Sequence, residues 1–397
     1  MRLARPPRGA DILLRSSFVR KGTPSVTTPE ETPGAPPSGP GRPVPEGPPP
    51  AVPAAITRIF SGMQPSGELH IGNWLGALAN WVALQDRHPC IFSIVDLHAI
   101  TQDYEPAEMP ARIRDMALGW LAAGIDPERS VVFVQSAVPE HAELAWIFNT
   151  LVPLGLLERM TQFKDKAKNQ PENVNAGLLT YPLLQAADIA IYKADGVPVG
   201  EDQVQHLEMA RDAVRKFNNR FGEVFPEPQP ILSPARKVLG LDGERKMSKS
   251  LNNQIGLNDS PEVVWAKLAP AKTDVRRKKR TDPGVPEDCN IFAYHGFFSS
   301  LEERAWAAEG CRTAGIGCRD CKQVLAKNLD AALAPMRERR AELERHPGRV
   351  DEILAAGAAT LRPIAQATME EVRDRMGLDA RARYAGQPSA PPLRGPD

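Results

Sequence analysis

The stretch Cys90-Ile91-Phe92-Ser93-Ile94-Val95-Asp96 decides the fold class of this 397-residue chain. It is a continuous apolar run that is too short and too rich in β-branched residues for a helix, so it predicts a buried parallel strand. Val131-Val132-Phe133-Val134 has the same character, and residues 106–123 between the two runs carry apolar residues at helical spacing. This strand–helix–strand alternation predicts an α/β fold with a doubly wound parallel sheet.

The segments on either side extend the same alternation. Upstream, Ile59-Phe60 predicts a strand, and residues 61–67 form a loop marked by glycine and proline that leads into a helix over 71–84. Downstream, we expect a helical section over 139–190, a short strand at Val197-Pro198-Val199 and a helix over 203–218. Residues 56–250 are therefore predicted to form one α/β domain that contains a helical insertion.

The pattern changes after residue 250, where no strand-like run remains. Apolar residues recur there at helical spacing in two series: Leu325, Leu329, Leu333, Met336; and Ile353, Leu361, Ile364, Met369, Val372, Met376. Residues 251–385 are predicted to form an all-helical domain, in which Pro335 is expected to kink or interrupt a helix.

Prolines are concentrated at the chain ends. Residues 1–55 hold 14 of the 39 prolines and few large apolar residues, which predicts a disordered extension, and residues 386–397 predict a disordered tail. The arginine-rich first 21 residues leave a second interpretation open, a mitochondrial transit peptide.

The charges of the chain cancel, with 49 basic and 49 acidic residues. This balance argues against a protein that coats nucleic acid non-specifically, because that function needs a large field of one sign. No stretch approaches the 18 apolar residues of a membrane span, and the N-terminus lacks the apolar core of a secretory signal. We expect a cytoplasmic protein that does not bind membranes.

Two motifs are typical of phosphate binding. His70-Ile71-Gly72-Asn73 lies where the first loop enters a helix, a position at which backbone N–H groups and a positive dipole end meet an anion. His70 and Asn73 offer further donors, although a histidine beside a helix start is more often a structural residue than a ligand.

Lys246-Met247-Ser248-Lys249-Ser250 is the second motif, in a segment rich in Gly, Asp and Lys. Two lysines that flank a hydroxyl on a flexible loop can close on a triphosphate and follow the charge onto departing pyrophosphate. A solvated lysine-rich loop is the simpler alternative.

Together the two motifs resemble the paired signatures of class I aminoacyl-tRNA synthetases. Four further segments are similar to tryptophanyl-tRNA synthetases: residues 61–67 (SGMQPSG), 95–98 (VDLH), 181–188 (YPLLQAAD) and 198–203 (PVGEDQ). The resemblance implies a Rossmann-like catalytic domain followed by a helical anticodon-binding domain. It also implies ATP and L-tryptophan as substrates, Mg²⁺, a tRNA partner and a homodimer.

The resemblance implies roles for individual residues. His70, Asn73, Lys246, Ser248 and Lys249 would carry catalysis, with His70 as a donor to phosphate and the lysines on the leaving phosphates. The implied ATP site comprises Gln64, Pro65, Ser66, Gly72, Asn73, Gly200, Glu201, Asp202, Val238, Lys246, Met247, Ser248, Lys249 and Ser250. Asp202 is suited to accept from ribose hydroxyls, and Val238 is expected beside adenine.

The implied tryptophan pocket centres on Asp188, a carboxylate in an apolar segment that would accept the indole N–H, a group that only donates. Tyr181 and Gln185 would hold the ammonium and carboxylate, and the apolar walls would be Phe60, Val95, His98, Val197 and Val199. A Tyr-x-x-x-Gln-x-x-Asp pattern also resembles tyrosyl-tRNA synthetases, so tyrosine is the alternative substrate. Asp188 could instead be a structural carboxylate on a helix face, paired with Lys193 or another cation.

Four of the five cysteines follow the spacing C-x21-C-x6-C-x2-C, at Cys289, Cys311, Cys318 and Cys321, whereas Cys90 lies in a predicted strand as a core residue. Clustered thiols in a reducing compartment indicate a metal, and zinc and a 4Fe-4S cluster both fit. A subset of bacterial tryptophanyl-tRNA synthetases has a similar spacing, and this resemblance favours the 4Fe-4S cluster. Packing without a metal is the third possibility.

The run Arg276-Arg277-Lys278-Lys279-Arg280 precedes the first of these cysteines. Such runs are usually solvated faces, but here the run adjoins the expected anticodon-binding region, so contact with tRNA phosphates is an equal alternative. A different kind of function, a regulatory paralogue that docks through its proline-rich extension, is disfavoured because both phosphate motifs are intact.

Overall fold

The computed structural model describes residues 52–53, 56–200, 203–232 and 238–378. All of them fall within one unit of the chain, Val44–Asp397. Almost all of the predicted N-terminal extension and the whole of the predicted tail lie outside the described residues, and so do Glu201 and Asp202.

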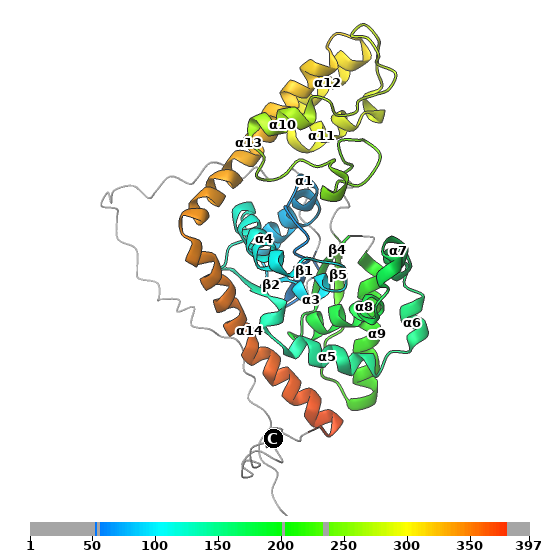
Figure 1. Ribbon diagram of the computed structural model, residues 1–397, viewed down its shortest axis with the longest axis vertical. Coiled ribbons are helices and arrows are strands. Elements are labelled where there is room, and N and C mark those ends of the chain that lie inside the picture. Colours follow the sequence, from blue (N-terminus) through cyan, green and yellow to red (C-terminus); the bar gives the residue numbers. More distant parts are fainter. Residues whose placement is uncertain (1–51, 54–55, 201–202, 233–237, 379–397) are drawn as a thin grey trace, which may run out of the picture. The chain divides into compact units, whose positions relative to one another are not determined.

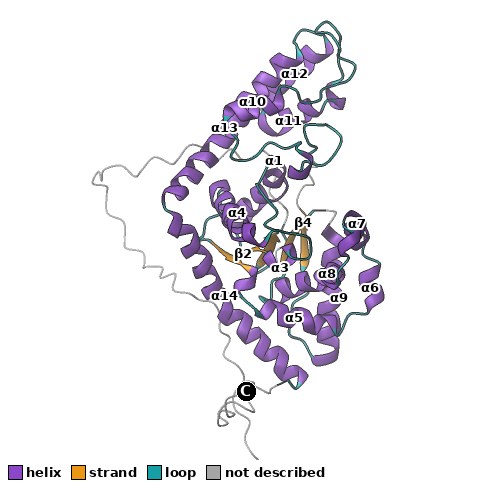
Figure 2. Cartoon of the chain, in the orientation of Figure 1, coloured by secondary structure: helices purple, strands orange, loops and turns teal. Residues whose placement is uncertain are grey.

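A parallel sheet of five strands forms the centre of the described structure (Figures 1 and 2). Its strands are β1 (Ile59–Met63), β2 (Cys90–Ile94), β3 (Ser130–Val134), β4 (Gly196–Val199) and β5 (Gln229–Leu232). In the order β3-β2-β1-β4-β5 the strand numbers fall as far as β1 and rise from β4, so the sequence order of the strands reverses between β1 and β4. In open α/β sheets, ligands bind at the carboxyl ends of the strands beside such a switch point.

Four of the five strands were predicted, and β5 was not. Pro230 lies within β5, and proline argues against a strand because it cannot donate to the ladder. β5 is an edge strand that pairs with β4 alone, so one side of its backbone needs no partner. The sheet order, which the local sequence does not reveal, is what makes Pro230 acceptable.

Side chains alternate between two apolar cores on opposite faces of the sheet. Ile59 and Phe92 enter one core, whereas Phe60 and Ile91 enter the other. This two-residue period explains why β1 and β2 are apolar throughout: both faces are covered by helices. Cys90 is buried in β2 as predicted.

Helices connect the strands on both faces of the sheet (Figure 1). The predicted 71–84 helix consists of α1 (Ile71–Asn73), a π-helical turn (Trp74–Leu78) and α2 (Ala79–Gln85). The other helices up to β5 are α3 (Asp96–Ala99), α4 (Met109–Ala123), α5 (Glu140–Asn149), α6 (Leu154–Glu158), α7 (Thr161–Asn169), α8 (Ala176–Ala190) and α9 (Val204–Phe221). Short 3-10 turns include η3 (Gln135–Ala137), directly after β3.

The region after residue 250 is helical, as predicted. Its helices are α10 (Pro261–Leu268), α11 (Asn290–Phe298), α12 (Leu301–Arg312), α13 (Cys318–Arg345) and α14 (Pro347–Met376). α13 packs against α4, and α14 packs against β3 and α5. None of the helices in the described ranges combines the length and the apolar character that crossing a membrane requires.

Pro335 was expected to kink or interrupt a helix. It lies inside α13, which continues through it, so the predicted interruption is wrong. Proline leaves the carbonyl four residues earlier without its helical partner. That carbonyl belongs to Ala331, an exposed residue that water can reach. The buried stripe of Leu325, Leu329, Leu333 and Met336 holds the helix on both sides of the break.

Candidate active site

The two phosphate motifs lie side by side at the carboxyl end of β1. The segment after the second motif pairs with the first: Ile71 N–H donates to Ile255 O at 3.0 Å, and Leu257 N–H to Leu69 O at 2.9 Å. A Cβ built on Gly72 would lie 3.5 Å from Met247 Cβ, and one built on Gly67 would lie 3.5 Å from Lys249 Nζ. The fold therefore brings together residues about 175 positions apart in the sequence.

His70 and Asn73 cap the helix that they begin. Asn73 N–H donates to His70 Nδ1 at 3.3 Å, and His70 N–H donates to Asn73 Oδ1 at 3.0 Å. Burial, together with the charge of Lys246, lowers the pKa of His70 to about 4. At neutral pH the ring is therefore uncharged, and because Nδ1 accepts, its proton is on Nε2. His70 can offer phosphate an N–H group but no positive charge.

The second motif alternates between buried and exposed residues. Met247 is 3% exposed and anchors the loop, whereas Lys246 and Lys249 are exposed. Val238 is buried beside it and accepts from Met247 N–H at 3.3 Å. Both lysine side chains can therefore move toward a phosphate without disturbing the anchor.

Asn253 holds this loop, a role that was not predicted. Its Oδ1 accepts from Ser248 N–H at 2.8 Å, and its Nδ2 donates to Asp242 Oδ2 at 2.9 Å. The Asn253 hydrogen bond is the main reason why the pKa of Asp242 falls to about 2. A Cβ built on Gly240 would lie 2.1 Å from Asn253 Nδ2, so glycine is required there. Asn253 is buried. Its role could not be predicted, because a single asparagine in a loop belongs to no sequence pattern.

A cavity of about 320 Å³ opens at the carboxyl end of β1, within the size range of small-molecule sites. It contains all eight residues predicted for the amino acid: Phe60, Val95, His98, Tyr181, Gln185, Asp188, Val197 and Val199. Gln64, predicted for ATP, lines it as well, together with Gln162, Lys166, Gln203 and His206, which were not predicted. β1, α8 and β4 supply most of the predicted residues, so the cavity lies at the switch point of the sheet.

Asp188 is 1% exposed and receives three hydrogen bonds. Gln135 Nε2 and His141 Nδ1 each donate to Oδ1 at 2.6 Å, and His98 Nε2 donates to Oδ2 at 2.8 Å. Burial alone would raise the pKa of Asp188, but the hydrogen bonds from His141 and His98 hold it well below its ordinary value. Asp188 is therefore an ionised carboxylate in a nearly dry environment.

A second layer fixes the tautomer of His141. Its Nε2 lies 2.6 Å from the Tyr192 hydroxyl. Burial, reinforced by Asp188 and Glu140, raises the pKa of Tyr192, so this phenol keeps its proton and can donate to Nε2. Nδ1 then carries the proton that the Asp188 carboxylate accepts. Gln135, His141 and Tyr192 are functional candidates that the sequence analysis missed, because they lie on or after different helical elements between β3 and β4 and share no motif.

The hydrogen bonds of Asp188 leave capacity for one more donor. Two carboxylate oxygens offer about four acceptor positions, and Oδ1 already accepts twice. Oδ2 accepts once, from His98, which lines the cavity, whereas Gln135 and His141 do not line it. The open position is therefore on the oxygen that faces the cavity. Of the structural alternative, the pairing with Lys193 is wrong, since Lys193 Nζ pairs with Glu371 Oε2 at 2.7 Å; the partners of Asp188 are instead His98 and His141.

Tyr181 lines the amino-acid cavity and contacts His206 and Lys166. Its hydroxyl lies 2.7 Å from His206 Nε2, and Lys166 Nζ lies 4.1 Å from its ring centroid. Burial raises the pKa of Tyr181 to about 12 and lowers the pKa of Lys166 from its ordinary value. A protonated phenol that donates to His206 keeps lone pairs with which to accept from an ammonium group.

The four cysteines Cys289, Cys311, Cys318 and Cys321 line one small cavity between α11, α12 and α13. Burial raises the pKa of Cys321 to about 12, and His295 Nε2 lies 3.2 Å from its sulfur. Among the described residues, no group of three or more His, Cys, Asp or Glu side chains is arranged to hold a metal ion. The predicted clustering of the thiols in space is therefore observed, but a metal site is not shown.

The basic run beside this cavity divides into two kinds of residue. Arg276 pairs with Asp274 at 2.8 Å and also with Asp288, and Arg277 donates to Ile316 O at 2.8 Å. A Cβ on Gly284 would meet the Arg277 side chain at 2.6 Å and Cys311 Sγ at 2.7 Å, so Arg277 packs into the wall of the thiol cavity. Lys278 is partly exposed and Lys279 fully so, and only their backbone N–H groups bond to Asp282. The run is thus partly structural.

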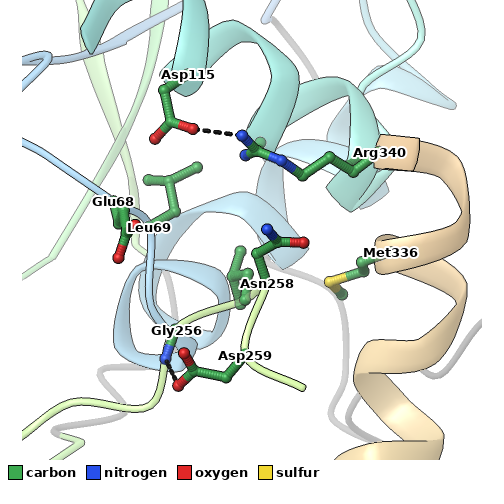
Figure 3. Close-up of a pocket in the computed structure, with 11 residues that line it drawn as sticks. Glu68, Leu69, Asp115, Gly256, Asn258, Asp259, Met336 and Arg340 are labelled. Atoms are coloured by element: carbon green, nitrogen blue, oxygen red, sulfur yellow. Dashed lines mark hydrogen bonds and ion pairs between the residues drawn. The ribbon is translucent and has the colours of Figure 1, made fainter. Parts of the chain in front are cut away.

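A second cavity, of about 100 Å³, lies where α13 meets α4 (Figure 3). Arg340 of α13 reaches Asp115 of α4 at 2.5 Å, and Asp259 accepts from Gly256 N–H at 2.7 Å. Asp259 also pairs with Lys267 at 2.6 Å. These charged groups already have partners, and the cavity lies between α4, α13 and residues 256–259.

Comparisons with known proteins agree with this geometry. Residues 54–334 match the family described as tRNA synthetases class I (W and Y), and the chain belongs to this family. The tryptophan–tRNA ligases of Deinococcus radiodurans and Thermotoga maritima are each 48% identical to it, over 81% of this chain and 99% of theirs. Within the class, the chain belongs to the tryptophan–tRNA ligases.

Solved structures give the same result. The tryptophanyl-tRNA synthetase of Campylobacter jejuni, determined with ADP and tryptophan, matches with a TM-score of 0.73 at 36% identity, over 81% of this chain and all of that one. A tyrosyl-tRNA synthetase of Archaeoglobus fulgidus matches with a TM-score of 0.57 at 22% identity, which speaks for the fold alone.

Proposed function

We propose that this chain activates L-tryptophan with ATP and transfers it to its cognate tRNA. The observation that carries the proposal is the open acceptor position of Asp188 in a cavity that is also lined by Gly62 and Gln64, at the end of β1 and in the loop that leads to the first phosphate motif. The indole N–H is a donor without acceptor capacity, and a buried, ionised acceptor discriminates strongly for such a group. Phe60, Val197 and Val199 are buried and supply apolar walls for the ring.

In the proposed reaction, a carboxylate oxygen of tryptophan attacks the α-phosphorus of ATP. The P–O bond to the β-phosphate breaks, and pyrophosphate leaves with the electron pair. Tryptophanyl-adenylate then transfers its acyl group to a ribose hydroxyl of the tRNA, which loses a proton, and AMP leaves. Because no protein group needs to form a bond, the protein contributes position and charge neutralisation. Mg²⁺ enters as part of the ATP substrate.

The residues divide the work along the cavity. His70 donates its Nε2–H to a phosphate, and Lys246 and Lys249 approach the leaving pyrophosphate from the opposite loop. Gln64, Pro65, Ser66, Gly72 and Asn73 bind ATP on the side of the first motif, and Gly200 and Val238 approach the nucleoside. Ser248 and Met247 shape the second loop. Glu201 and Asp202, also proposed for the nucleoside, lie outside the described residues, and Ser250 is proposed from its place in the motif alone.

Amino-acid-dependent exchange of pyrophosphate into ATP tests this proposal. We expect exchange with tryptophan and at most a trace with tyrosine, because relatives that are 48% identical to this chain are tryptophan–tRNA ligases. Charging of a tRNA for tryptophan should follow. Preference for tyrosine would reassign the substrate, and exchange with no amino acid would favour the regulatory role.

We further propose a 4Fe-4S cluster held by Cys289, Cys311, Cys318 and Cys321. The support is that the four thiols line one small cavity, of about 20 Å³. When bound, such a cluster would cross-link α11, α12 and α13. Protein purified without oxygen should be brown with broad visible absorbance, which C318S should remove. A colourless protein with stoichiometric zinc would favour zinc, and one free of metal would favour packing alone.

We propose that Lys278 and Lys279 contact tRNA phosphates, whereas Arg276 and Arg277 hold the turn. The double variant K278A/K279A should weaken tRNA binding and reduce the slope of log K against log salt concentration by about 1.5, since each phosphate contact contributes about 0.7–0.9. Pyrophosphate exchange should not change. An unaltered slope would contradict this proposal.

Three broader proposals follow from the same membership. We propose that the chain acts as a homodimer in the cytoplasm, and that its domains divide near residue 250. Light scattering of purified protein tests the first of these, and imaging of a tagged chain tests the second against the mitochondrial alternative. Limited proteolysis tests the domain division.

A further inference from the structure

One helix, α14, is tied from outside the cavity to the elements that supply Asp188 and two of its donors. Asp188 lies on α8, Gln135 begins η3, and His141 lies in the first turn of α5. These elements are far apart in the sequence from residues 347–376 of α14. No residue of α14 is among those that line the amino-acid cavity.

The first tie is to η3. Arg362 Nη2 donates to Ala137 O at 2.6 Å, at the end of the turn that Gln135 begins. Just before this turn, α14 lies so close to β3 that a Cβ built on Gly357 would approach Val132 O to 2.0 Å. Any side chain at position 357 would push α14 away from the strand that leads to Gln135.

The second tie is to α5. Arg373 Nε donates to Glu143 Oε1 at 2.7 Å, and its Nη2 donates to Oε2. Glu143 lies two residues after His141 on the same helical turn. The Arg373 side chain is 13% exposed and that of Glu143 is 39% exposed, so solvent screens this two-pronged bond from the side of Glu143. The hydrogen bond to Glu143 raises the pKa of Arg373.

The third tie is to the end of α8. Lys193, five residues after Asp188, pairs with Glu371 of α14 at 2.7 Å. Between these polar ties, the apolar face of α14 enters the same core as α5 and α8. Its members there are Ala358, Leu361, Ala365, Met369 and Val372.

We propose that α14 is a positioning element for the tryptophan-binding carboxylate, and that Arg373 is its main positioning residue. This inference rests on the proposed function, in which Asp188 accepts the indole N–H. A hydrogen bond to a buried carboxylate depends steeply on geometry, and a misplacement of about 1 Å can cost about 10²-fold in rate. Holding α5 and α8 in register from outside keeps the open position of Asp188 directed into the cavity.

The variant R373A tests this inference in the pyrophosphate exchange assay. We expect KM for tryptophan to rise about 10-fold, an effect of the size that sub-ångström displacement produces, while KM for ATP stays within about twofold. The preference for tryptophan over β-(3-benzothienyl)-L-alanine, in which sulfur replaces the indole N–H, should fall at the same time. A merely structural role would lower the active fraction and leave both KM values and this preference unchanged.

Three further variants complete the design. R349A, near the start of α14, is the matched control, since Arg349 is exposed and pairs at 3.5 Å with Glu352 of the same helix, and it should behave as wild type. R373K keeps the charge but loses the two-pronged bond, so an intermediate KM is expected. The charge swap E143R/R373E should recover part of the tryptophan affinity.

The inference is overturned if R373A leaves KM for tryptophan unchanged, or raises it together with KM for ATP while the preference over the sulfur analogue stays constant. Failure of the proposed function looks different, because the wild-type chain itself would then not respond to tryptophan.

Discussion

We expect the variant D188N to lose about 10²- to 10⁴-fold in kcat/KM for tryptophan, because truncating one partner of a buried, hydrogen-bonded charge costs about 3–5 kcal/mol. An asparagine has one accepting and one donating end. If its oxygen faces Gln135 and His141, its NH₂ group faces His98 and the substrate N–H, and two donors then oppose each other. Pyrophosphate exchange at varied tryptophan concentration measures the loss.

The preference for tryptophan over the benzothienyl analogue distinguishes this effect from unfolding. The wild type should prefer tryptophan strongly, since the analogue leaves Asp188 with an unused acceptor, and D188N should lose most of that preference. D212N is a suitable control, because Asp212 is half-exposed and lies 3.7 Å from Arg215 on α9. A folded D188N that keeps the full preference would show that Asp188 does not read the indole.

The variant K249A should lower kcat of tryptophan-dependent exchange by about 10²- to 10³-fold, the size typical for removal of one group that stabilises transition-state charge. Lys249 is exposed, and its Nζ approaches the position of a Cβ on Gly67 in the first loop to 3.5 Å. Its charge can therefore follow the leaving pyrophosphate, where the negative charge increases during the reaction. KM for tryptophan should change little, because Lys249 does not line the amino-acid cavity.

A matched lysine on another element checks that charge alone is not responsible. Lys327 is exposed on α13, and K327A should leave the exchange rate unchanged. K249R should recover part of the rate. A K249A variant that changes KM for ATP but keeps kcat would assign Lys249 to ground-state binding of ATP.

Strands and helices with a clear apolar pattern in a short stretch of sequence were predicted correctly. The runs at Cys90 and Val131 became β2 and β3, and the apolar stripes after residue 320 became α13 and α14. β5 escaped prediction because the order of the strands, and not its own residues, makes Pro230 acceptable at the edge. Pro335 led to the prediction of an interruption that does not occur, since packing on both sides of it keeps α13 continuous.

The residues of the site likewise fall into those that the sequence predicted and those that only the structure showed. Every residue that the motifs predicted for the amino acid lines one cavity, because each motif sits at the end of a strand or on α8, and the parallel sheet gathers these ends at one edge. Lys166, His206 and Asn253 belong to no such pattern and emerged only from the structure. The arginines of the basic run show the converse, since a charge pattern cannot reveal that Arg276 and Arg277 are committed to neighbours.

By itself, the sequence determined the class of fold, the family and the chemical groups of the site, because strand runs, helical stripes and contiguous motifs are all encoded within short windows. The tertiary structure decided how those groups are used. It made His70 an uncharged donor by burying it, and it kept Asp188 ionised through hydrogen bonds from His141 and His98, which come from two separate elements. Protonation and hydrogen-bond capacity depend on burial and on neighbours across the fold, and neither can be read from a local pattern.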